Sequence, residues 1–431
     1  MASLPRYAIP LAAAMLAAGV ALVVASVPDA PQPAASPDVR ILLSGDPFAA
    51  ILEQEASAIA GTTASVRFER AGYDATREAV LNQARTRSGT FDLVAFDVVW
   101  TAELAEAGAL EPLDGVLANH PEVDPGGILE AAMAGMRWRG RTWGLPIQPH
   151  SELLWGRTDL LSAAGLGLPA TPDDLVAAAR ALHRPAEGVY GIVWNAQRGS
   201  ALGQTMAHFY AAFGQRLLDD RGRPALTGTG GIQAARLALA LRDHSPPDIL
   251  TTAWDQRRRR FMAGEAALTF EWGARFGEGL RSPECRVVGR VACAPPPRAP
   301  GVAPVAAFGT WCLGIPAGVR DREAAGRLLA AICGPDGARR LAAAGNAGVP
   351  RRDLLTDEIL GSRFANLFPV MRELDRTGAF NPHVRPASPH WDGLCRVMGE
   401  VFHDMLRGEL TPEAAVDDAQ RRASALWDEV R

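Results

Sequence analysis

Residues 91–97 read FDLVAFD, a mostly apolar run that ends in an aspartate. A short apolar run bounded by polar residues is typical of a strand buried on both faces. Two further runs of strand character precede it at 39–43 and 65–69, and helical patterns at 48–59 and 74–87 separate the three. Strands that alternate with helices predict an α/β fold on a mainly parallel sheet, with helices on both of its faces.

The residues that directly follow each strand are the first candidates for a binding site. In open α/β sheets, ligands bind beyond the carboxyl ends of the strands. Asp46 follows the first predicted strand, and Asp97 and Trp100 follow the third. Each aspartate has a structural alternative, because Asp97 is also suited to cap a helix and Asp46 to cap one or to form an ion pair.

The composition is that of an ordinary globular chain with a weak negative charge. Its 431 residues are 48% hydrophobic and 21% charged, with a formal net charge of −4. This length is sufficient for two lobes with a core each, and the charge gives no general attraction to nucleic acid. All 44 basic residues are arginine, which excludes Schiff-base and P-loop lysine chemistry.

The N-terminus has the pattern of an export signal. Arg6 precedes an apolar stretch at 7–27, and Val24-Ala25-Ser26 offers a cleavage site. Residues 1–27 are therefore predicted to be a signal peptide or an uncleaved anchor, because such a stretch is also long enough to span a bilayer. Residues 28–37, rich in Pro, Ala and Ser, are predicted to be a tether. The mature protein is expected to be periplasmic or otherwise extracytoplasmic.

The rest of the chain continues the alternation of strands and helices. A hairpin is predicted at 138–146, and further strands are predicted at 153–155, 190–194 and 311–315. Residues 261–270 are predicted to lead from the end of a helix into a strand that is followed by Glu271 and Trp272. Helices are predicted at 175–182, 202–213, 231–242, 320–331, 391–406 and 412–430. The basic run 257–260 has helical spacing and is interpreted as a solvated helix face, not as a nucleic-acid site.

No catalytic or metal-binding pattern is present in the sequence. There is no Gly-x-Ser-x-Gly, no His-Glu-x-x-His and no close cluster of Cys and His. The five cysteines are too scattered for a disulfide scaffold, although Cys285 and Cys293 are near enough in sequence to leave a pairing open. We therefore expect a protein that is not an enzyme and that binds no metal or cofactor.

Several segments, taken in order, resemble the ABC-importer extracellular solute-binding proteins of family 1, which include maltose- and other sugar-binding proteins. The first runs from Phe91 through Asp97 and Trp100 to Asp114. The later ones are Gly144-Leu145-Pro146, Leu153-Leu154-Trp155, Thr171-Pro172-Asp173-Asp174-Leu175, Phe261 to Trp272, Asn381 to Pro386 with Trp391, and Leu410 to Ala415. Together they cover about 39–430 and keep the family's order.

The resemblance implies a periplasmic-binding-protein-like fold, with two discontinuous α/β lobes joined by a hinge. The chain would cross between the lobes three times, near Ile147, Phe308 and Val349. Lobe 1 would comprise 38–147 and 308–348, and lobe 2 would comprise 148–307 and 349–431.

The resemblance also implies a function. The chain would bind a sugar, oligosaccharide or polyol in the cleft between the lobes, close by hinge bending and deliver the solute, as a monomer, to the permease subunits of an ABC importer. Three alternatives remain: an anionic solute such as a sugar phosphate, a membrane-anchored sensory role, and a glycoside-active enzyme in which Asp97 and Glu271 mimic a carboxylate pair.

A carbohydrate site needs polar groups for hydroxyl edges and aromatic rings for C–H faces. Trp272 and Trp391 are placed by the resemblance as stacking residues, with a core position as the alternative for each. Gln148 and Trp311 lie near predicted crossings, and Arg351, like Arg385, has a guanidinium fork suited to vicinal hydroxyls or to a salt bridge. The predicted ligand-binding residues are Asp46, Asp97, Trp100, Gln148, Asn195, Glu271, Trp272, Trp311, Arg351 and Trp391.

Overall fold

A mixed β-sheet of nine strands runs through the part of the chain that the computed structural model describes, residues 38–61, 65–280, 282–381 and 384–429. The predicted signal segment 1–27 and tether 28–37 lie outside the described residues. The nine strands are β1 (Asp38–Ser44), β2 (Ser65–Ala71), β3 (Leu93–Asp97), β6 (Leu145–Arg157), β7 (Tyr190–Val193), β8 (Ala266–Trp272), β9 (Val291–Ala294), β10 (Ala306–Gly314) and β11 (Phe380–Asn381), and a separate two-stranded sheet consists of β4 (Arg137–Trp138) and β5 (Arg141–Thr142).

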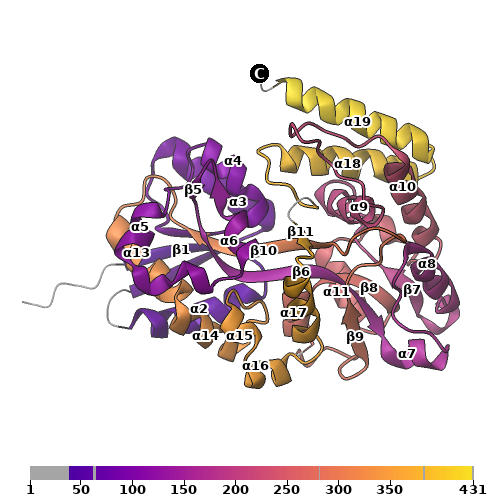
Figure 1. Cartoon of the computed structure of the whole chain (residues 1–431), viewed down its shortest axis with the longest axis horizontal. Helices are drawn as coiled ribbons and strands as arrows, with labels where there is room; N and C mark the ends of the chain where they lie inside the picture. The colour runs from indigo at the N-terminus through magenta and orange to yellow at the C-terminus, as the bar shows by residue number, and fades with distance from the viewer. Residues whose placement is uncertain (1–37, 62–64, 281, 382–383, 430–431) are drawn as a thin grey trace, which may run out of the picture. The chain divides into compact units, whose positions relative to one another are not determined.

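The sheet is continuous in the order β2-β1-β3-β10-β6-β8-β7, with β9 paired to β6 and β11 paired to β10. Its longest strand, β6, is buried along its whole length. The first half of β6 pairs with β10, and its second half pairs with β8 and β9. Thus β6 and β10 join two groups of strands that are far apart in sequence (Figure 1).

The prediction of a mainly parallel sheet is wrong for its centre. Parallel pairing occurs between β1 and β2, between β1 and β3, between β7 and β8, and between β10 and β11. The central pairs of β10 with β3, β10 with β6 and β6 with β8 are antiparallel. Strands alternate with helices near the N-terminus, and there the pairing is parallel. Long segments of chain precede β6 and β10, and no local sequence pattern predicts whether these two strands run parallel or antiparallel to their neighbours.

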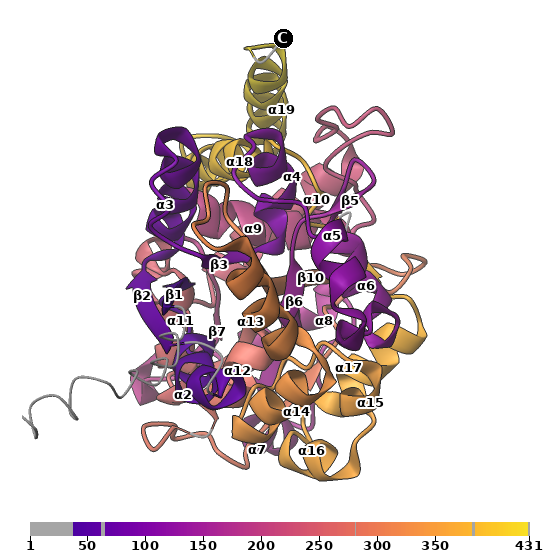
Figure 2. The same ribbon diagram turned by 90° about the vertical axis from the view of Figure 1, so that its left-hand side faces the viewer.

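The helices cover both groups of strands (Figures 1 and 2). They are α2 (Phe48–Ala60), α3 (Tyr73–Thr86), α4 (Thr101–Glu106), α5 (Asp114–Asn119), α6 (Glu130–Gly135), α7 (Thr158–Ala163), α8 (Pro172–Ala181), α9 (Ser200–Ala212), α10 (Thr229–Arg242), α11 (Trp254–Met262), α12 (Gly273–Gly279), α13 (Arg322–Cys333), α14 (Pro335–Ala344), α15 (Arg352–Leu355), α16 (Glu358–Arg363), α17 (Phe368–Arg376), α18 (Trp391–Leu406) and α19 (Pro412–Glu429).

Segments that are distant in sequence pack together in both groups. Helices α13 and α14 pack against α2, as Figure 2 shows. On the other side, α18 packs along α9 and α19. The approach of α9 to α18 requires glycine, because a Cβ at Gly203 would lie 2.0 Å from the carbonyl oxygen of Cys395. This close packing fixes the position of α9, which carries one wall of the site described below.

Local signals identified several of the helices. Thr171 caps α8 in a capping box with Asp174, as the Thr-Pro-Asp-Asp sequence predicts. The predicted 391–406 helix coincides with α18. The helices α5, α6, α12 and α14 to α17 were not predicted. None of the helices among the described residues has the length and apolarity needed to cross a membrane.

Candidate ligand-binding site

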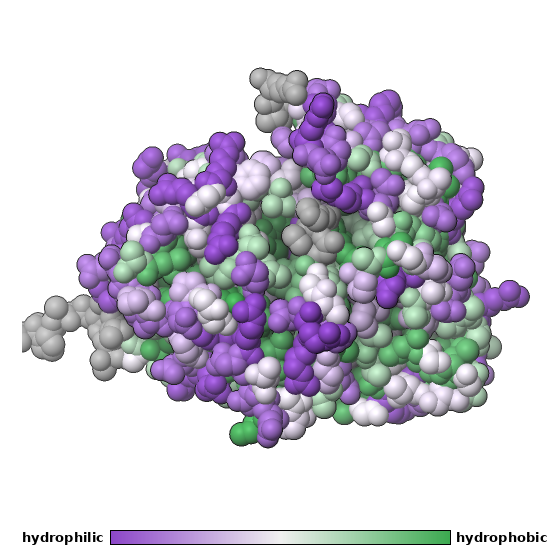
Figure 3. Space-filling view, in the orientation of Figure 1, coloured by the Kyte–Doolittle hydropathy of each residue, from purple (hydrophilic) through white to green (hydrophobic). Residues whose placement is uncertain are grey.

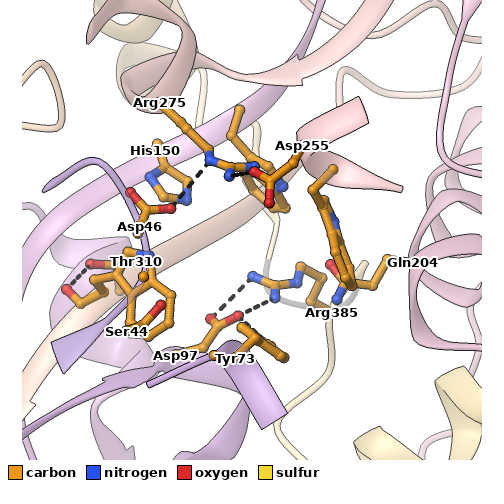
Figure 4. Close-up of a pocket in the computed structure, with 15 residues that line it drawn as sticks. Ser44, Asp46, Tyr73, Asp97, His150, Gln204, Asp255, Arg275, Thr310 and Arg385 are labelled. Carbon is orange, nitrogen blue, oxygen red and sulfur yellow. Dashed lines mark hydrogen bonds and ion pairs between the residues drawn. The ribbon is translucent and has the colours of Figure 1, made fainter. Parts of the chain in front are cut away.

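A cavity of about 200 Å³ lies where β1, β2 and β3 end (Figure 4). The cavity is lined by Ser44, Gly45, Asp46, Gly72, Tyr73, Asp97, His150, Gln204, Trp254, Asp255, Trp272, Arg275, Thr310, Trp311 and Arg385.

The surface of the molecule is mixed in character. Figure 3 shows that hydrophilic residues are spread over the face seen in Figure 1, with apolar residues visible between them.

One wall of the cavity consists of the residues at the carboxyl ends of three neighbouring parallel strands. Ser44 ends β1 and is followed by Gly45 and Asp46. Tyr73 follows β2 and begins α3, and Asp97 ends β3. These positions agree with the rule that ligands bind beyond the carboxyl ends of strands in α/β sheets.

The other walls come from elements later in the chain. His150 lies on β6, and Thr310 and Trp311 lie on β10. The remaining side chains are Gln204 of α9, Trp254 and Asp255 of α11, Trp272 of β8, Arg275 of α12, and Arg385.

A carboxylate and a guanidinium face each other across the cavity in a two-pronged ion pair. Arg385 Nη2 lies 2.6 Å from Asp97 Oδ2, and Nη1 lies 3.4 Å from Oδ1 (Figure 4). The hydroxyl of Tyr73 donates a hydrogen bond to Asp97 Oδ2 at 2.8 Å. Burial and the neighbouring Asp97 carboxylate raise the pKa of the Tyr73 hydroxyl well above its ordinary value. Tyr73 is therefore a neutral hydrogen-bond donor at pH 7.

A second cation is shared between two carboxylates. Arg275 Nε lies 3.4 Å from Asp46 Oδ2, and Arg275 Nη2 also bonds Asp255. Asp46 accepts a hydrogen bond from the backbone N–H of Phe48 at the start of α2. Asp46 therefore caps a helix and also joins two walls of the cavity.

His150 is a neutral group in this charged surrounding. Burial lowers the pKa of its imidazole to about 4, although Asp46 and Asp97 act in the opposite direction. A neutral imidazole offers one donor and one acceptor. Its Nδ1 is buried and has no hydrogen-bond partner among the described residues.

Aromatic rings complete the lining. Trp272 is 7% exposed, and the guanidinium carbon of Arg385 lies 5.0 Å from its ring centroid, with the ring of His150 at 4.8 Å. Tyr73 lies 5.9 Å from Trp254 and 6.0 Å from Trp311 between ring centroids. The cavity thus combines aromatic faces with hydrogen-bonding edges, the combination that hydroxyl-rich molecules require.

The side chains do not form a metal centre. In the parts of the chain that the structure describes, no three His, Cys, Asp or Glu residues are grouped so that they could hold a metal ion. The acidic side chains of the cavity are instead engaged with arginines.

A profile of the bacterial extracellular solute-binding proteins matches residues 43–339. The chain belongs to this family. The protein is accordingly the solute-binding component of an ABC transporter, in a family that is not enzymatic and acts outside the cytoplasm.

Individual relatives agree with this assignment. A mannitol-binding protein of Pseudomonas aeruginosa is 25% identical over 367 residues, 80% of this chain and 82% of its own. An ABC transporter solute-binding protein of Agrobacterium radiobacter K84, solved with ribitol, has a TM-score of 0.85 at 26% identity and covers 92% of this chain and 100% of its own. The maltose-bound protein of T. maritima shares the fold, with a TM-score of 0.81, 24% identity, and coverage of 91% and 100%. The predicted periplasmic-binding-protein fold is therefore confirmed.

Four of the ten predicted ligand-binding residues line the cavity of this solute-binding protein: Asp46, Asp97, Trp272 and Trp311. Trp100 does not line it. Its ring lies behind the wall, 4.5 Å from the ring of Tyr73, and is fully buried.

Three other predicted residues are also buried outside the lining. Gln148 donates from Nε2 to Glu278 at 2.7 Å. Asn195 follows β7 and is 1% exposed. Glu271 forms an ion pair with Arg257 at 2.8 Å, so it is held within the protein and does not face the cavity.

The last two predicted residues lie in structural positions. Arg351 pairs with Asp124 at 2.6 Å and contacts backbone carbonyls of the same turn, which is the salt-bridge alternative. Trp391 begins α18 and packs in the hydrophobic core, which is the core alternative for this residue.

Sequence reasoning missed Tyr73, Gln204, Trp254, Asp255, Arg275 and Thr310, all of which line the cavity. The strand-end rule would have found Tyr73 and Arg275, which follow β2 and β8 just as Asp46 follows β1. Gln204 and Trp254 lie on helices, and no local signal distinguishes them from other helical positions. His150, beside the predicted crossing at Ile147, is a lining residue that was not among the predicted ten.

Proposed function

We propose that this solute-binding protein captures a neutral polyol or a single sugar in the cavity and delivers it to the permease subunits of an ABC importer. The observation that carries the proposal is the cavity itself, small and lined by aromatic rings, in which each arginine is already neutralised by an aspartate.

The charge arrangement favours a neutral solute over an anionic one. Arg385 is held by Asp97, and Arg275 is held by Asp46 and Asp255. With three carboxylates, two guanidinium groups and a neutral His150, the lining carries an excess negative charge. This negative charge would repel an anionic solute, which would also have to displace an existing ion pair. Hydroxyl groups, in contrast, can form hydrogen bonds with both partners of the pair.

The size of the cavity favours a small solute. Its volume of about 200 Å³ is below the roughly 300–1,000 Å³ of pockets that hold drug-sized ligands. An open-chain polyol or one sugar ring suits this space better than an oligosaccharide. Trp272 would then cover the carbon face of the solute while Asp97, Arg385 and His150 bond its hydroxyls.

The names of the relatives support the same class. The relative from Pseudomonas aeruginosa is a mannitol-binding protein, and the structure from Agrobacterium radiobacter K84 holds ribitol. Both are neutral open-chain polyols, in agreement with the charge and the size of this cavity.

The contacts across the cavity support closure by a hinge. Asp46 and Asp97 belong to the predicted lobe 1, and their partners Arg275 and Arg385 belong to the predicted lobe 2. Bending of β6 and β10 would separate these pairs and open the cavity. In this proposal, the lobe boundaries are the predicted ones, the segment 1–27 directs export, and the closed monomer is the form that the permease recognises.

A thermal-shift screen tests the size and class of the solute. We expect ribitol and D-mannitol to raise the melting temperature, because a ligand that binds only the folded state stabilises it. Maltose is expected to have no effect at the same concentration. A shift with maltose and none with either polyol would contradict the proposal.

A further inference from the structure

A chain of four charged or ionisable side chains is buried behind Trp272. His208 Nε2 lies 2.7 Å from Glu152 Oε2, and Glu152 Oε1 lies 2.6 Å from Arg257 Nη1. Arg257 Nη2 continues to Glu271 Oε1 at 2.8 Å. Each of these side chains is 4% exposed or less. We call these four residues the buried chain. The sequence-based interpretation of Arg257 as part of a solvated face is wrong.

Two members of the buried chain lie next to cavity residues on strands. Glu152 is two residues after His150 on β6, and side chains two residues apart on a strand point to the same face. Glu271 precedes Trp272 at the end of β8, and its Oε1 accepts a hydrogen bond from the Trp272 backbone N–H at 2.9 Å. Glu152 and Trp272 are also direct partners in the sheet.

The other two members lie next to cavity residues on helices. His208 is one turn after Gln204 on α9, and its ring centroid lies 6.1 Å from that of Trp272. Arg257 is one turn after Trp254 on α11. Residues three or four apart lie on the same side of a helix. Every member of the buried chain therefore has a cavity residue as its neighbour on its own element, and the four members lie on four different elements.

The buried chain requires all its members. Burial of an ion costs several kcal/mol, which is offset only when the partner is present in good geometry. Burial raises the pKa of Glu152, but His208 and Arg257 outweigh this effect and hold it at about 2. The carboxylate thus remains ionised, and removal of one of its two partners leaves its buried charge only partly compensated.

We propose that the buried chain is a positioning unit that fixes His150, Gln204, Trp254 and Trp272 relative to one another. It ties β6, α9, α11 and β8 together through ion pairs, so that the wall of the cavity that belongs to the predicted lobe 2 is formed before the solute enters. The four members do not contact the solute. This inference rests on the proposed function, because it assigns the unit a role in solute affinity.

The test compares two substitutions of His208, with D-mannitol as the probe. His208→Leu removes the contact with Glu152, and His208→Gln keeps a donor on a side chain of similar size. We expect His208→Leu to raise the Kd of D-mannitol roughly tenfold, the range seen when residues that orient a site are removed. His208→Gln should restore the Kd to within about threefold of the unmodified protein.

A matched control and a second measurement separate positioning from stability. Arg157→Gln removes a buried guanidinium from its ion pair with Asp159, within the predicted lobe 2 and outside the cavity lining, so it should lower the melting temperature and leave the Kd unchanged. In His208→Leu, hydrogen exchange should rise at the Trp272 amide and at the start of α11 as well as in α9. A folded His208→Leu with unchanged Kd and with faster exchange confined to α9 would overturn the inference. If D-mannitol does not bind even the unmodified protein, the proposed function fails. The positioning role of the buried chain is then tested by the hydrogen-exchange measurement alone.

Discussion

At the scale of single residues, Trp272 has two structural roles. Its ring lines the cavity, yet it is 7% exposed and packs with Ala307 and Val384 in a small apolar cluster. The guanidinium of Arg385 lies over the same ring. Loss of this side chain therefore removes a stacking face for the solute and also the packing of the wall that carries it.

We predict that Trp272→Ala lowers both affinity and stability. The free energy of D-mannitol binding should weaken by about 1.5–3 kcal/mol through lost stacking and apolar contact. The free energy of unfolding should fall by about 3–5 kcal/mol, as for other large-to-small changes at buried sites. Calorimetry and thermal melts of the same variant measure the two effects.

Trp391→Ala is the matched control, because Trp391 is buried in the core at the start of α18. It should show a comparable loss of stability with unchanged affinity. A Trp272→Ala protein that binds D-mannitol as tightly as the unmodified protein would remove Trp272 from the site.

The sequence indicates which residue types lie at strand ends, but not which of them face the solute. Trp100 was predicted from its place after a strand, and Trp272 and Trp391 from the family resemblance, but of these three only Trp272 lines the cavity. The difference depends on how elements pack, since Trp100 lies against the far side of Tyr73. Arg257 shows the same limit, because its two carboxylate partners are 105 and 14 residues away in sequence.

At the scale of elements, β6 carries two side chains whose protonation is linked to folding. Burial depresses the pKa of His150 to about 4 from the ordinary 6.5, and the pKa of Glu152 is about 2 instead of 4.5. In both cases the unfolded chain binds a proton more readily than the folded one. Stability therefore falls as the pH falls.

We predict that stability declines from pH 6.5 towards pH 4 through His150, by up to about 3 kcal/mol in the free energy of unfolding. Below pH 4.5, protonation of Glu152 adds a further decline. Urea denaturation at a series of pH values measures both. His150→Gln should flatten the curve between pH 6.5 and 4 and leave the decline below 4.5. An unchanged slope in this variant would assign the acid sensitivity to other groups.

Individual elements were well predicted where local patterns are strong. The capped helix α8 and the amphipathic α18 follow from N-cap chemistry and apolar spacing. The strand β10 was predicted too late and too short, at 311–315 instead of 306–314, because its first residues follow a loop rich in Pro and Ala. The exact bounds of β10 depend on its pairing with β6 and β3, and a short stretch of sequence around β10 carries no information about these distant strands.

At the scale of the whole molecule, the fold depends on contacts between distant parts of the chain. The pairs Asp97–Arg385 and Asp46–Arg275 join residues 288 and 229 positions apart, and periodicity does not predict such contacts. The fold was predicted from the resemblance to the family, and that resemblance rested on the order of the matched segments. The lobe boundaries and the monomeric state stay predictions.

The most direct test of the account is a calorimetric titration of the purified protein with D-mannitol and, in parallel, with D-mannitol 1-phosphate. We predict a single site for D-mannitol with micromolar or tighter affinity, corresponding to about −8 kcal/mol or better. The phosphate should not bind measurably, because both cavity arginines are already paired with aspartates. Tight binding of the phosphate without binding of D-mannitol would contradict the account.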